Sequence, residues 1–124
     1  MAMSDSRSTP LDRPGGETCA KVRMRPIDLH HLSRQTLGDR SVEQEVLMLF
    51  LQQANLVKDR FAVASAAERV RLAHGLRGSA LGVGAFPIAD WASGVEAHPD
   101  GRQFVRSLSR LIDEVRDFIA AVNR

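Results

Sequence analysis

Residues 104–122 read FVRSLSRLIDEVRDFIAAV, and the spacing of the apolar side chains in this stretch decides the fold class. Intervals of three and four residues place them on one face of a helix, at Phe104, Leu108, Leu111, Val115, Phe118, Ile119 and Val122. Most of the residues between them are charged or small, as on the solvent side of an amphipathic helix. The pattern predicts a long terminal helix with one buried face.

Three earlier segments have the same helical period. Ser41 has capping-box spacing to Gln44, which predicts a helix over residues 41–63. A further helix is expected over residues 65–83, and another with Pro87 at its first position. In the helix over residues 41–63 the expected inward residues are Val46, Leu47, Phe50, Leu51, Ala54, Val57 and Phe61. In the helix that begins at Pro87 they are Ile88, Trp91, Ala92 and Val95.

Short connections join these segments and determine how the helices are arranged. A short leading helix should begin after Asp28 as N-cap and stop at Gly38, and residues 98–101 (HPDG) interrupt the chain before the last helix. Short loops between long amphipathic helices imply antiparallel neighbours. The sequence therefore predicts an all-α fold, an antiparallel four-helix bundle with a short additional N-terminal helix.

Length and composition set the broad class. The chain has 124 residues, of which 44% are hydrophobic and 26% charged, which suits one folded domain. Residues 1–25 have no apolar periodicity and are expected to be a flexible tail, and residues 26–124 form the domain. The single Cys19 favours a reducing compartment, and no apolar run could span a bilayer, so a cytoplasmic protein without a membrane partner is expected.

The distribution of charge and the spacing of possible metal ligands predict neither nucleic-acid binding nor a metal site. The formal net charge is +2 and the basic residues are scattered without interleaved aromatics, so nucleic-acid binding is not expected. His30 and His31 are adjacent and diverge on a helix, and Cys19 lies alone in the tail, so no metal site is expected.

Residues 72–85, LAHGLRGSALGVGA, carry the chemistry. On a helical wheel Leu72, Leu76 and Val83 fall opposite His74, and with Ala80 they form the expected buried face. His74 then points to solvent. The apolar Val70 and Leu81 lie on the same side of the helix, together with Arg77 and Gly78. A small apolar ring around a titratable group is what a docking patch needs.

Three glycines interrupt this same helix. Gly75, Gly78 and Gly82 form one smooth strip beside His74, and each costs roughly 1 kcal/mol relative to alanine. Two explanations are open at this point. The strip either packs closely against another helix or leaves room for an approaching partner.

The string His74-x-Leu76-Arg77-Gly78-Ser79, closing with Val83-Gly84-Ala85, resembles the signature of histidine-containing phosphotransfer (HPt) domains, and the similarity covers about Ile27 to Glu96. The resemblance implies a phosphorylated histidine, His74, on the exposed face of a four-helix bundle, with Arg77 stabilising phosphate charge and Gly78 giving the partner access. Together with the apolar ring and the glycine strip, it leads us to expect a partner-binding surface made of Val70, Arg71, Gly75, Leu81 and Gly82.

The same resemblance implies the partners. Phosphoryl would pass reversibly between His74 and the receiver domains of a hybrid histidine kinase and a response regulator. The receiver would supply Mg²⁺, and the chain itself would need no cofactor. Arg77 replaces the commoner lysine, and Gly75 stands where the family usually has a side chain. The charge of the lysine is kept, whereas its donor geometry is not.

Two other functions compete with the phosphocarrier. One is a helical docking module for receiver domains or other signalling proteins that carries no phosphate. The other is the dimerising histidine domain of a sensor kinase, which should have an acidic residue after the histidine, where this chain has Gly75. The chain has no glycine-rich nucleotide loop, so intrinsic kinase activity is not expected.

Overall fold

The computed structural model describes residues 25–123, and all regular structure in this range is α-helical. The five helices are α2 (Leu29–Thr36), α3 (Arg40–Phe61), α4 (Ala66–Val83), α5 (Phe86–Ala97) and α6 (Gln103–Val122). The expectation of an all-α chain is confirmed for these residues. The tail predicted over residues 1–25, with its Cys19, lies outside the described residues except for Arg25.

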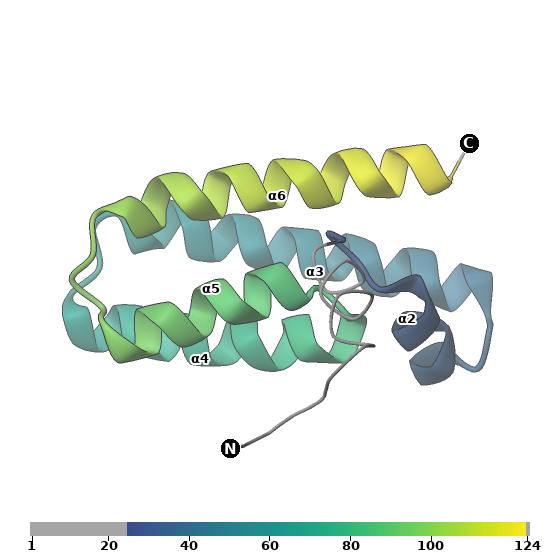
Figure 1. Cartoon of the computed structure of the whole chain (residues 1–124), viewed down its shortest axis with the longest axis horizontal. Helices are drawn as coiled ribbons and strands as arrows, with labels where there is room; N and C mark the ends of the chain where they lie inside the picture. The colour runs from purple at the N-terminus through teal and green to yellow at the C-terminus, as the bar shows by residue number, and fades with distance from the viewer. Residues whose placement is uncertain (1–24, 124) are drawn as a thin grey trace, which may run out of the picture.

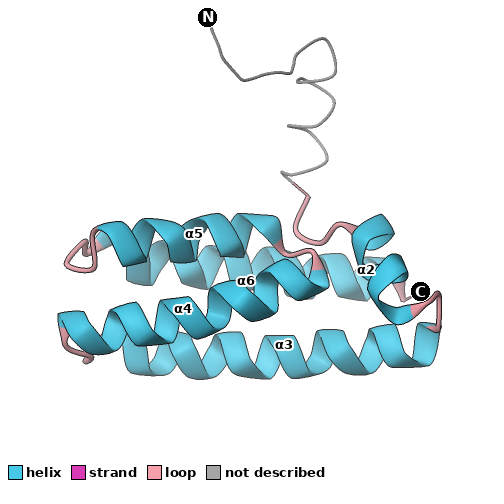
Figure 2. Ribbon diagram, turned by 90° about the horizontal axis from the view of Figure 1, so that it is seen from below, coloured by secondary structure: helices cyan, strands magenta, loops and turns pink. Residues whose placement is uncertain are grey.

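The four longer helices lie side by side, and the chain reverses direction between each and the next (Figure 1). In the described part of the chain, α3 and α5 each contact both α4 and α6, whereas α4 and α6 do not contact each other. The short α2 packs on α3 and α4 at one end of these helices (Figure 2). This arrangement puts the outer faces of α4 and α6 at opposite corners of the molecule.

Side-chain caps explain where three of the helices begin. The Asp28 carboxylate accepts a hydrogen bond from the His31 amide at 3.1 Å, as predicted, and Ser65 accepts one from the Glu68 amide at 3.2 Å. The prediction of a cap at Ser41 is wrong. Asp39 caps α3 by accepting from the Val42 amide, because its backbone is extended and the helix already begins at Arg40.

The start of α5 also differs from the prediction by one residue. The helix begins at Phe86, so Pro87 occupies the second helical position instead of the first. Neither of these positions needs an intrahelical partner for its backbone N–H, so proline is tolerated at both.

The turn between α4 and α5 is tied to the start of α2. Gly84 ends α4 with a positive φ of 84°, and its carbonyl accepts a hydrogen bond from the Asp28 amide at 2.9 Å. A Cβ at Gly84 would lie 2.8 Å from the Asp28 carbonyl oxygen. Glycine is therefore required here both by the backbone conformation and by the close approach of the two segments.

The core lies between the helices, and each helix contributes to it. Its fully buried members include Leu32, Phe61, Leu76, Ile88, Val95, Leu108, Ile112 and Val115. The expected inward residues of α5 are all buried, and those of α3 are buried except for Val46, which is partly so. On α6 the predicted face is buried only in part, because Leu108, Val115 and Ile119 are buried whereas Phe104, Leu111, Phe118 and Val122 are partly exposed. Ile112, which the sequence analysis did not select, is fully buried.

The buried face of α4 is rotated relative to the prediction. Ala73 is fully buried, whereas Leu72 is only partly buried and packs at the edge of the core. Glu96 of α5 contacts Arg77, which lies on the same side of α4 as Ala73 and Ala80, whereas Leu72 borders an open groove between α3 and α4. The buried arc of α4 is therefore shifted away from Leu72. Leu76 and Val83 are buried as predicted.

None of the helices described here is long and apolar enough to cross a membrane.

Candidate functional site

His74 lies in the middle of α4 on its solvent side, as predicted. Its side chain is 71% exposed, whereas the neighbouring Ala73 and Leu76 are fully buried. The core therefore fixes the helix on both sides of the histidine, and the imidazole itself remains accessible to a partner.

Glu96, near the end of α5, contacts both His74 and Arg77 of the predicted site. Its Oε1 lies 3.1 Å from His74 Nδ1, and its Oε2 lies 3.2 Å from Arg77 Nε. The Glu96 side chain is only 21% exposed, so these contacts are partly shielded from water. The sequence analysis missed Glu96 because it lies on a different helix and no motif marks it.

The contact with Glu96 determines which nitrogen of the His74 ring is available. An ionised carboxylate only accepts hydrogen bonds, so Nδ1 is the donor in the contact with Oε1. In the neutral ring the lone pair is then on Nε2, on the side of the imidazole away from Glu96. With Nδ1 donating to Glu96, Nε2 is the ring nitrogen whose lone pair stays free.

The glycine strip beside His74 faces open space. A Cβ added at Gly75, Gly78 or Gly82 would have no atom within 4 Å outside its own stretch of helix. No other helix packs against the strip, so close helix packing does not explain these glycines. Access for a partner is the explanation that agrees with this geometry.

The remaining predicted surface residues differ in exposure. Arg71 is exposed and Leu81 is 44% exposed, which leaves both available for contact. Val70 is half-buried, contrary to the prediction that it stands on the exposed side. Its place on the wheel is at the edge of the face covered by α5, which packs along α4 more extensively than any other helix does.

An apolar stripe on α3 extends this surface and was not predicted. Leu49 is 60% exposed and Leu56 is 62% exposed. They line two adjoining grooves between α3 and α4, whose other walls include Gln53, Arg71, Leu72, Gly75 and Ser79. The glycine strip thus continues into an apolar groove. A single sequence period could not separate these leucines from the buried ones, because α3 is apolar over a wide arc.

No protein-family model, curated protein or solved structure matches this chain. The assignment of a function therefore depends on the residues and geometry of the site. Among residues 25–123, no group of three or more histidine, cysteine or acidic side chains is placed to hold a metal ion.

The open glycine strip leads to a first prediction. Gly78→Gln should raise the melting temperature, since replacing a helical glycine gains up to about 1 kcal/mol and the new Cβ meets nothing within 4 Å. On the phosphocarrier hypothesis from the sequence, the same variant should take up phosphoryl poorly from a receiver, because a long side chain would stand one turn from His74. Thermal melts and transfer assays measure the two effects separately.

Gly82→Ala is the matched control for that variant. It lies farther along the strip and adds only a methyl group, so it should stabilise the protein with a smaller loss of transfer. A Gly78→Gln protein that melts lower and transfers normally would contradict the access explanation.

Proposed function

We propose that this chain is a histidine phosphotransfer protein of a multistep phosphorelay, built as the antiparallel four-helix bundle of an HPt domain and acting in the cytoplasm. It accepts a phosphoryl group on His74 from a receiver aspartate and passes it to another receiver. The observation that carries the proposal is the exposed His74 imidazole, held at Nδ1 by Glu96 beside Arg77 and an open glycine strip.

The transfer step follows from the orientation of the ring. The Nε2 lone pair bonds to phosphorus while the bond from phosphorus to the receiver's aspartyl oxygen breaks, and the electron pair leaves with the carboxylate. Nδ1 keeps its proton throughout. The phosphorylated ring is therefore cationic, and the Glu96 carboxylate that accepts its Nδ1–H supplies the opposite charge. The reverse step returns the phosphoryl group to an aspartate.

Arg77 and the receiver's Mg²⁺ both neutralise negative charge on the phosphoryl group in the transition state. The transition state of phosphoryl transfer is loose, so positioning and charge neutralisation account for most of the catalysis. Arg77 is held by one nitrogen, Nε, on Glu96, which leaves its terminal guanidinium nitrogens free to donate to phosphoryl oxygens. The receiver supplies the metal ion, and the chain needs no cofactor or kinase activity of its own.

The docking surface for the receiver combines α4 with α3. The glycine strip allows close approach of backbone, and Leu49, Leu56 and Leu81 provide apolar contacts around it. An apolar centre with a polar rim is the usual composition of a specific interface. Leu49 and Leu56 therefore join Arg71, Leu81 and the glycines as proposed contact residues.

The direct experiment is to mix the chain with a receiver domain carrying labelled aspartyl phosphate. The proposal expects the label to move to the chain and to be acid-labile and base-stable, as phosphohistidine is. If the chain binds the receiver with no transfer of label, it is the phosphate-free docking module instead. If it neither binds nor accepts phosphate from any receiver of its source organism, the proposal is wrong.

A second prediction concerns Glu96. Glu96→Ala should slow phosphoryl transfer about tenfold, which corresponds to about 1.4 kcal/mol for loss of a charged hydrogen bond. Glu96→Gln should restore part of the rate, because the amide oxygen still accepts from Nδ1 but no longer neutralises the phosphorylated ring. Quench-flow transfer rates at saturating receiver measure this effect apart from docking.

Glu45→Ala is the control, because Glu45 is an exposed glutamate on α3. It should transfer at the wild-type rate. Wild-type rates in both Glu96 variants would show that Glu96 does not position His74.

A further inference from the structure

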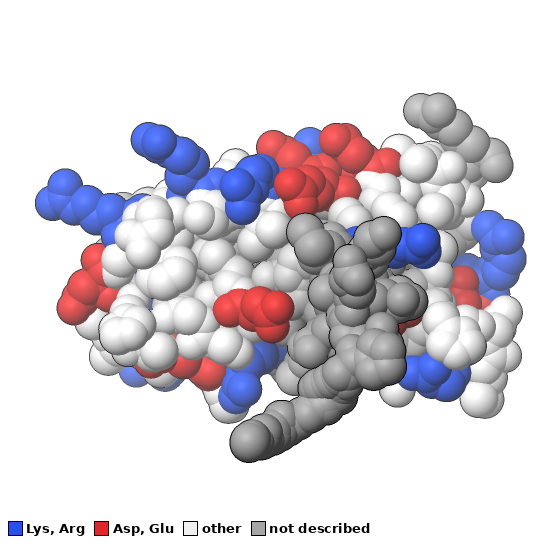
Figure 3. Space-filling view, in the orientation of Figure 1, with Lys and Arg blue, Asp and Glu red and all other residues white. Residues whose placement is uncertain are grey.

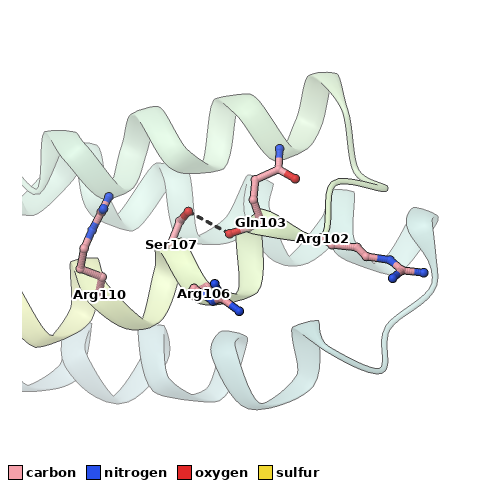
Figure 4. Close-up of a pocket in the computed structure, with 5 residues that line it drawn as sticks. All are labelled: Arg102, Gln103, Arg106, Ser107 and Arg110. Atoms are coloured by element: carbon pink, nitrogen blue, oxygen red, sulfur yellow. Dashed lines mark hydrogen bonds between the residues drawn. The ribbon is translucent and has the colours of Figure 1, made fainter.

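The solvent face of α6 separates positive from negative charge along its length. Three exposed arginines, Arg102, Arg106 and Arg110, occupy its start and first half, and Asp113, Glu114 and Asp117 follow in the second half, where Arg116 is the one exposed basic residue. Figure 3 shows blue side chains gathered over the first half of this helix and red ones beyond them. The arginines border a shallow hollow with Gln103 and Ser107, and no acidic side chain lines it (Figure 4).

This separation of charge does not stabilise the helix that carries it. The N-terminal end of a helix favours anions and the C-terminal end favours cations, by up to about 1 kcal/mol for each exposed charge. The first turn of α6 has no acidic residue and its last turn has no basic one. The arrangement is therefore the reverse of the one that the helix dipole favours.

The charges also share one direction. At 100° per residue, Arg106, Arg110, Asp113 and Asp117 fall within about 60° of one another, opposite the buried face of α6. The buried residues Leu108, Ile112, Val115 and Ile119 define that opposite face. The helix therefore presents a single exposed stripe, positive along its first half and negative along its second.

The stripe is complementary to itself in one register. Arg110 and Asp113 flank the Leu111–Ile112 bond symmetrically, and Arg106 and Asp117 flank the same bond symmetrically. In an antiparallel pair of identical helices related by a two-fold axis, residues placed symmetrically about the centre face each other. One two-fold axis at this bond would therefore bring Arg106 opposite the partner's Asp117 and Arg110 opposite its Asp113.

Arg106 and Asp117, the pair farther from the axis, have no ion-pair partner among the described residues of one chain. Arg110, in contrast, contacts Glu114 at 3.9 Å, and Arg116 contacts Asp113 at 2.6 Å. Pairing two copies would satisfy Arg106 and Asp117 and extend the inner pairs into a network. Networks of charges stabilise more than isolated surface pairs do.

We propose that two copies of this chain associate through their α6 helices, antiparallel and about a two-fold axis at the Leu111–Ile112 bond. The facing stripe is almost entirely polar, so the association is weak and depends on low ionic strength. Because α6 does not contact α4 within the described part of the chain, both His74 faces stay open in the pair. The inference is independent of the proposed phosphotransfer.

Charge reversal on the full chain tests this arrangement. Sedimentation velocity at about 0.01 M salt should show concentration-dependent dimers that disappear at about 1 M salt. Arg106→Asp with Arg110→Asp should abolish self-association, and so should Asp113→Arg with Asp117→Arg. Mixing the two double variants should restore a dimer that contains one of each, because all four facing pairs then again join opposite charges.

A matched control separates the register from net charge. The matched variant carries Asp59→Arg and Asp90→Arg, at exposed positions on α3 and α5, and keeps α6 unchanged. It should dimerise with itself as the wild type does. It should form no mixed dimer with the Arg106→Asp, Arg110→Asp protein, because two of the four facing pairs would then join like charges. Circular dichroism should show the same helix content in every variant. A monomer at low salt and millimolar concentration would overturn the proposal, and so would a mixture of the α6 variants that stays monomeric. Loss of association only on changing the arginines would point instead to an acidic surface elsewhere.

Discussion

Replacing His74 with glutamine is expected to abolish phosphoryl uptake and leave the fold unchanged. The His74 side chain is 71% exposed and makes its polar contact with Glu96, so no core packing is lost. Glutamine is a better helix former than histidine, and this should offset the lost contact. Its amide nitrogen is not nucleophilic, so the variant has no atom that can replace Nε2.

Two measurements on the same sample test this expectation. Circular dichroism and thermal melting should match the wild type, and label from a phosphorylated receiver should stay on the receiver or be hydrolysed. Binding of the receiver to the variant should persist, because the docking surface is intact. A variant that still becomes labelled would show that another residue is the acceptor. A loss of helix content would show that His74 has a structural role.

Gly84→Ala is expected to cause the largest loss of stability of the substitutions considered. The backbone at this position has a φ of 84°, and the left-handed conformation costs a non-glycine residue about 1–2 kcal/mol. The new methyl group would also lie 2.8 Å from the Asp28 carbonyl oxygen, and such overpacking costs about 1–3 kcal/mol more. The expected loss is therefore about 2–5 kcal/mol.

Gly75→Ala on the same helix is the control, and the expected effect has the opposite sign. A Cβ at Gly75 meets nothing within 4 Å, so alanine there should stabilise by up to about 1 kcal/mol. Urea unfolding of the two variants gives both free energies of unfolding. A Gly84→Ala protein as stable as the wild type would show that the contact between the α4–α5 turn and Asp28 relaxes at little cost.

The sequence by itself determined which segments are helical and which helix carries the candidate chemistry. The apolar period of residues 104–122 and the caps Asp28 and Ser65 are local features, and local features act through the nearest turns of backbone. The exposure of His74 followed from the same period. The cap of α3 was misplaced because Asp39 and Ser41 are both suitable N-caps, and only the turn at Gly38 places Asp39 at the helix start.

The tertiary structure alone decided how the candidate site is completed. Glu96 reaches His74 and Arg77 because α5 packs along α4, and a contact between residues on separate helices leaves no periodic signal in either one. The helical period shows which side of α3 is apolar, but only the positions of its neighbours leave Leu49 and Leu56 uncovered. Tertiary structure also distinguishes the glycines in and after α4. Local backbone preference favours glycine at the positive φ of Gly84 and disfavours it inside the helix at Gly78. Only the packing of distant segments shows that a Cβ would collide with the Asp28 carbonyl at Gly84 and would meet open space at Gly78.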